Sequence, residues 1–84
     1  MPYIIPSRRE SLKLGAPPAG AGELNFQISK LVVAYIKEHR MSYQTINDIV
    51  GALEGAKLEF YRRLAVPYEN AKLSTNGDVY EFAD

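Results

Sequence analysis

The sequence predicts a mainly helical protein: a helical hairpin whose long second helix is kinked at a proline, with short extended segments at the termini. Three observations lead to this fold class. Apolar residues recur at three- and four-residue spacings from residue 23 to about residue 64. Four of the five prolines fall within the first 21 residues, and the fifth, Pro67, interrupts the helical pattern.

Residues 1–21 are expected to form an N-terminal arm and Pro/Gly-rich loop, ahead of a helical domain at residues 22–84 with a C-terminal turn and a short strand. The run GAPPAGAG at residues 15–22 is typical of a loop or linker. Ser7 could cap a helix through Leu12, but the surrounding prolines and glycines limit that helix to roughly two turns. We therefore expect an arm rather than a packed element.

The first long helix is predicted over residues 23–40. Glu23 lies in its first turn, and basic side chains in its last turn favour the helix dipole. The apolar stripe, which predicts one buried side, consists of Leu24, Ile28, Leu31 and Tyr35, flanked by Val32 and Ile36.

The second helix is predicted to begin after an N-cap at Ser42. Pro67 lacks a backbone donor and clashes with the preceding turn, so we expect a kink or break at residues 63–66. The stripe of this helix consists of Ile46, Ile49, Val50, Leu53, Ala56, Phe60 and Leu64.

Helical composition resumes after the proline, at residues 68–73, and the pair Asn76-Gly77 predicts a helix stop or tight turn. Residues 79–82 alternate like a short strand, which could pair with residues 3–5 of the same or a neighbouring subunit.

Helices of about 18 and up to about 32 residues cannot cover each other, since the longer one would extend roughly 45 Å. We therefore expect a homo-oligomer whose chains share a helical bundle, with a monomeric hairpin as the alternative. Gly51 and Gly55 mark either a helix crossing or tolerated positions on a solvated face.

Tyrosine, arginine and lysine side chains that could bind a ligand are concentrated in residues 58–80. Arginine forks suit phosphate or carboxylate, and tyrosine rings offer stacking surfaces, so this region predicts a site for a nucleotide-like anion. In the alternative reading the arginines pair with Glu59 and Glu69, and the tyrosines line the edge of a core. The predicted ligand-binding residues are Tyr3, Tyr61, Arg62, Arg63, Tyr68, Lys72, Asn76 and Tyr80.

Other functions are less well supported by the sequence. A formal charge of zero argues against general nucleic-acid binding. His39 is the only histidine and lacks a nucleophile pattern, so a surface role is expected. Asp78 and Glu81 lack a third ligand and the chain has no cysteine, so no metal is expected, and no cofactor either. No spacing suggests a paired acid and base, so no enzyme is expected. No apolar run is long enough to span a bilayer, which predicts a cytoplasmic, non-membrane protein.

The chain also resembles a family of short uncharacterised phage and bacterial proteins. The resemblance lies in MPYI (1–4), GELN (22–25), residues 43–53, KLE (57–59), YRR (61–63), PYE (67–69), Lys72 and NGDVY (76–80). It implies a small phage-encoded accessory protein in a bacterial host, with a first element shortened at residues 11–20. By analogy, some such proteins sequester nucleotide signals of bacterial immunity.

These observations lead to one functional hypothesis and two alternatives. We expect a non-enzymatic homo-oligomer that binds an anionic nucleotide-like ligand, such as a cyclic or NAD-derived immune signal held by a phage sponge. The alternatives are a protein-protein interaction module, acting as an inhibitor or adaptor, and an enzyme that acts on nucleotides.

Overall fold

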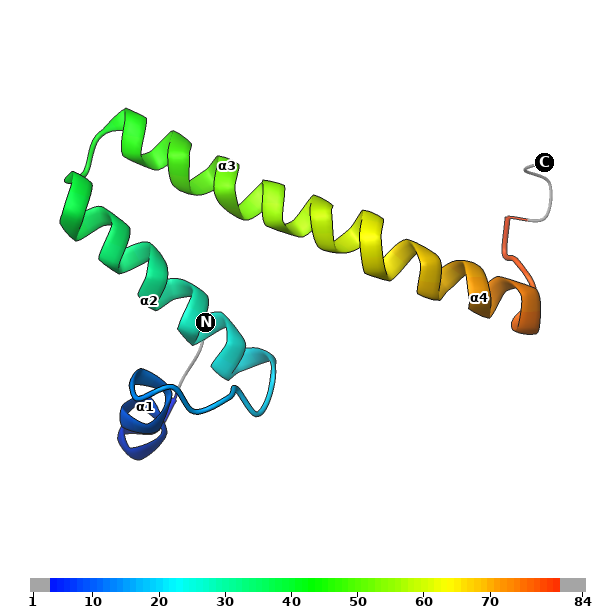
Figure 1. Ribbon diagram of the computed structural model, residues 1–84, viewed down its shortest axis with the longest axis horizontal. Helices are drawn as coiled ribbons and strands as arrows, with labels where there is room; N and C mark the ends of the chain where they lie inside the picture. The colour runs from blue at the N-terminus through cyan, green and yellow to red at the C-terminus, as the bar shows by residue number, and fades with distance from the viewer. Residues whose placement is uncertain (1–3, 81–84) are drawn as a thin grey trace. The chain divides into compact units, whose positions relative to one another are not determined.

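The computed structural model describes residues 4–80, and every regular element in that range is helical (Figure 1). In chain order these elements are α1 (Pro6–Lys13), α2 (Ala21–His39), α3 (Tyr43–Phe60), the π-helical turn η1 (Tyr61–Ala65) and α4 (Val66–Asn76). The predicted mainly helical class is confirmed. The chain divides into two units, residues 1–46 and residues 47–84.

The predicted terminal strand pair is not found among residues 4–80. Ile4, Val79 and Tyr80 belong to no helix or strand, and Ile5 has extended backbone without being part of a strand. The reason is that two short strands without a third, or without a helix to pack on, are marginally stable in water. Tyr3 and residues 81–82, which the prediction also used, lie outside the described residues.

In the first unit, α1 packs against α2, and among the described residues the buried apolar side chains are Leu12 and Phe26. Leu12 of α1 is 5% exposed and Phe26 of α2 is 8% exposed. The eight residues of α1 confirm the expected two turns, and Ile5 rather than Ser7 stands at its N-cap. Pro6 occupies the first turn, where a helix does not need its missing N–H. The burial of Leu12 differs from the expected unpacked arm.

The first long helix is confirmed as α2, and within this chain only part of its predicted stripe is covered, since Val32 and Ile36 are partly buried. Leu24, Ile28 and Leu31 are 49%, 40% and 73% exposed in this chain, whereas Phe26 is buried. The spacing of apolar residues shows which side chains share one face of a helix. Which of them becomes buried depends on where a neighbouring element packs, and here α1 packs at Phe26.

A set of hydrogen bonds holds the turn between α2 and α3. Arg40 has a positive φ of 67°, unusual for a side-chain-bearing residue, and its N–H donates to the Ile36 carbonyl at 2.7 Å. The Thr45 hydroxyl donates to the Arg40 carbonyl at 2.6 Å, and the Thr45 N–H donates to Ser42 Oγ at 3.1 Å. Ser42 is therefore the N-cap of α3, as predicted, and Thr45 is 3% exposed.

In the second unit, α3 continues through η1 into α4, so that one helical path runs to Asn76 (Figure 1). In η1 the Val66 N–H donates to the Tyr61 carbonyl, five residues earlier. Pro67 follows in the first turn of α4. The helix therefore does not break: the effect predicted at residues 63–66 takes the form of a π turn, which shifts the hydrogen-bond register ahead of the missing donor.

The helix ends where the Asn76-Gly77 pair predicts. Gly77 has a φ of 86°, a conformation that glycine adopts without a steric cost, and its N–H donates to the Leu73 carbonyl at 2.9 Å. Within the described part of the chain, no helix combines the length and apolar character needed to span a bilayer.

Candidate functional site

The long helix of the second unit carries a row of exposed apolar side chains. Leu53, Phe60 and Leu64 are 45%, 59% and 64% exposed. Every residue from 50 to 64 is exposed in this chain. Isolated helices are marginal in water, and most of the stability of a helix in a protein comes from packing of its apolar face. Among the described residues of this chain, nothing buries this row.

The π turn keeps the exposed apolar side chains near one face of the helix. Phe60, Leu64 and Tyr68 are spaced four apart, and in a regular α-helix two successive four-residue steps drift about 80° round the axis. A π turn holds more residues than an α turn, so it removes part of this drift. As a result, Leu64 and Tyr68 remain near the face that carries Phe60. We call Leu53, Phe60, Leu64 and Tyr68 the apolar row.

The two predicted arginines pair with a carboxylate of their own helix. Arg62 Nη2 donates to both Glu59 oxygens, at 3.1 and 2.9 Å, and Arg63 Nη1 lies 3.6 Å from Glu59 Oε1. The arginine side chains are 74% and 71% exposed. Ion pairs between such exposed groups contribute about 0.5 kcal/mol or less, so a competing anion could displace Glu59.

Lys72 and Tyr68 form a second pair one turn apart. The Lys72 ammonium lies 5.7 Å from the centre of the Tyr68 ring, within the range of a cation–π contact. Tyr61 and Tyr68 are 50% and 65% exposed. The structure therefore places the predicted cations and rings on the solvent-exposed helix, in two local groups.

Asn76 lies further along the helix than these two groups. Asn76 ends α4, 13 residues after Arg63, a rise of roughly 20 Å along a helix. The Tyr80 N–H donates to Asp78 Oδ1 at 2.8 Å, a local turn contact. Tyr3 lies outside the described residues.

The two glycines predicted as a possible crossing point face open space in this chain. A Cβ built on Gly51 or on Gly55 meets no heavy atom within 4 Å. Within one chain they occupy a solvated face, and a crossing with a second chain stays a prediction.

A cluster that the sequence did not reveal joins α1 to α2. Arg8 Nε donates to Glu23 Oε2 at 2.8 Å, and the Ala19 N–H donates to Glu23 Oε1 at 2.9 Å. The Glu23 side chain is only 17% exposed. The Arg8 guanidinium, followed by the Ala19 amide, lowers the pKa of Glu23 to about 2 from its ordinary value of 4.5. No local pattern could predict this pair, because its members lie 15 residues apart on two helices that are joined by an irregular loop.

The depressed pKa of Glu23 predicts acid-sensitive docking of α1. Since the folded value lies below the unfolded one, the interaction stabilises the unit fully above about pH 4.5 and is lost as the pH falls toward about 2. NMR amide shifts of α1, followed from pH 7 to pH 2, should move toward random-coil values within that window. Glu23→Gln should show the weakened docking already at pH 7 and lose the transition, whereas Glu54→Gln, which alters an exposed pair with Lys57, should retain it. An unchanged transition in Glu23→Gln would contradict the assignment.

Comparison with known proteins places the chain in a family. The model of the family described as Domain of unknown function (DUF6899) matches residues 1–79, and the chain therefore belongs to this family. A search of curated proteins and a search of solved structures found no match.

Proposed function

We propose that this member of a family without an assigned function is a self-associating binding protein that performs no catalysis of its own. Its assembly surface is the apolar row of the long helix. The observation that carries the proposal is the exposure of that row, with Phe60 at 59% and Leu64 at 64%. A second copy offers the same row, so one contact would cover both.

Energetic considerations support this proposal. Covering one large apolar side chain contributes roughly 1.5–3 kcal/mol. Two copies of the apolar row present eight such side chains, which is enough to offset the entropic cost of association. Self-association would also stabilise the helix itself, because most of the stability of a protein helix comes from packing of its apolar face.

A nucleotide-like anion is the ligand class that the exposed cations favour. Arg62 and Arg63 share the single carboxylate of Glu59, and Lys72 follows one turn beyond Tyr68. With Glu69 included, this stretch carries three cations and two carboxylates, an excess of one positive charge. Guanidinium forks bind phosphate in a bidentate manner, and the exposed tyrosine rings can stack on a base. A cyclic or NAD-derived nucleotide is the ligand of this proposal, with a protein partner as the alternative.

Light scattering and calorimetry test both parts. Size-exclusion chromatography with multi-angle light scattering should give at least twice the mass of one chain, and titration with a panel of cyclic and NAD-derived nucleotides should release or absorb heat. Arg62→Gln with Arg63→Gln should lose the heat and keep the mass. The matched control Lys57→Gln, which removes a paired surface cation elsewhere on the helix, should keep both. A monomer without a heat signal would rule out the proposal.

A further inference from the structure

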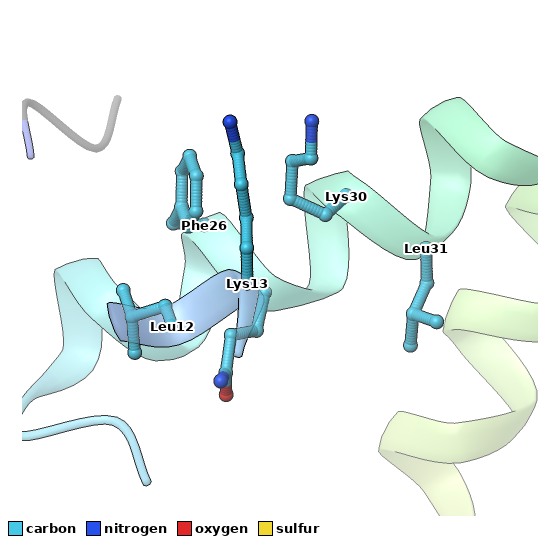
Figure 2. A pocket seen from close by; sticks show the side chains of 6 residues that line it. Leu12, Lys13, Phe26, Lys30 and Leu31 are labelled. Carbon is cyan, nitrogen blue, oxygen red and sulfur yellow. The ribbon is translucent and has the colours of Figure 1, made fainter. Parts of the chain in front are cut away.

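A groove lies between α1 and α2 in the first unit. Its lining side chains are Leu12, Lys13, Phe26, Gln27, Lys30 and Leu31 (Figure 2). Leu12 and Phe26 form its buried part, and Leu31, at 73% exposure, also lines the groove. An apolar groove of this kind suits an apolar or aromatic side chain of a binding segment.

The rim of this groove is basic. Lys13 and Lys30 extend to the same side of the groove as the Phe26 ring (Figure 2). The Lys13 ammonium lies 3.5 Å from Glu10 Oε1, a weak pair between exposed side chains. The Arg9 guanidinium lies over the face of the Phe26 ring, 5.6 Å from the ring centre. Three cations with one carboxylate favour an acidic segment.

One segment of this chain has the complementary chemistry. Residues 78–84 read DVYEFAD, in which three carboxylates alternate with apolar and aromatic side chains. Val79 is 87% exposed and Tyr80 is 64% exposed. Residues 81–84 lie outside the described residues.

We propose that the acidic segment at residues 78–84 of a second copy binds the α1–α2 groove. An aromatic side chain of the segment contacts Leu12, Phe26 and Leu31, and the flanking carboxylates pair with Lys13 and Lys30. This inference depends on the proposed self-association, which brings a second copy within reach. Charge and apolar character match on both sides, which is the complementarity that specific association uses.

Photo-crosslinking of the full chain tests the inference. Phe82 is replaced by p-benzoyl-phenylalanine, unlabelled protein is mixed with ¹⁵N-labelled protein, and crosslinked peptides are mapped by mass spectrometry after irradiation. We expect crosslinks from residue 82 to residues 12–31 in peptides that join one labelled and one unlabelled chain. Lys13→Gln with Lys30→Gln should lower the yield at least fivefold. The control pair Lys37→Gln with Lys57→Gln, which removes two exposed cations outside the groove, should leave it unchanged.

Circular dichroism must show equal helicity in both double variants, so that a loss of yield reports on charge rather than folding. Crosslinks that map elsewhere, that join residues of one chain only, or that persist in Lys13→Gln with Lys30→Gln would overturn the inference. Light scattering on the same samples separates the two proposals. An oligomer without these crosslinks defeats the groove assignment alone, whereas a monomer defeats the proposed function as well.

Discussion

Replacing Phe26 with alanine is expected to release α1 from α2. Phe26 and Leu12 are the buried apolar side chains of the first unit, at 8% and 5% exposure. Truncation of a buried phenylalanine costs about 3 kcal/mol or more, and a core this small has little with which to compensate for the loss. Hydrogen exchange of the α1 amides at neutral pH should accelerate about 100-fold, since each 1.4 kcal/mol corresponds to a factor of ten.

The matched control for this experiment is Leu24→Ala, on the same helix. Leu24 is 49% exposed, so its truncation should change α1 exchange by less than about threefold, as surface substitutions usually do. Arg8 and Glu23 remain in both variants. If Phe26→Ala left the exchange of α1 as slow as in the unmodified protein, the Leu12–Phe26 core would not be what holds α1.

The second large effect is expected at the apolar row, where Leu64→Asp should dissociate the assembly. A leucine buried between copies contributes roughly 1.5–3 kcal/mol, and a symmetric contact loses it twice. The introduced carboxylate adds the cost of removing a charge from water. Sedimentation velocity over a concentration series should show the dissociation constant raised at least 100-fold.

Leu58→Asp provides a matched control on the same helix. Leu58 and Leu64 are 58% and 64% exposed. Leu58 precedes Phe60 by two residues, which places it about 200° round the helix from the apolar row. The two variants introduce the same residue into the same helix, so they share its helix-propensity cost. Equal dissociation in both would show that the row is not the assembly surface, and no dissociation in either would point to another contact.

For the proposed anion site, the sequence predicts the kinds of side chain involved but not how they lie along the helix. The sequence identified Arg62, Arg63 and Lys72 as the exposed cations, and also that Glu59 could neutralise the arginines. It could not show that Asn76 lies roughly 20 Å further along the helix, because that distance depends on the helix being continuous through Pro67.

The sequence by itself determined the features that arise from short-range physics. Periodicity predicted α2, a hydroxyl at Ser42 predicted the cap of α3, and Asn76-Gly77 predicted the stop of α4, because each depends on residues only a few positions apart. Only the tertiary structure decided that Phe26, rather than Leu24 or Leu31, is buried and that Arg8 meets Glu23. The physical reason is that burial and ion pairing depend on which faces meet in space. The irregular loop between α1 and α2 determines which faces come into contact, and no local sequence pattern encodes its conformation.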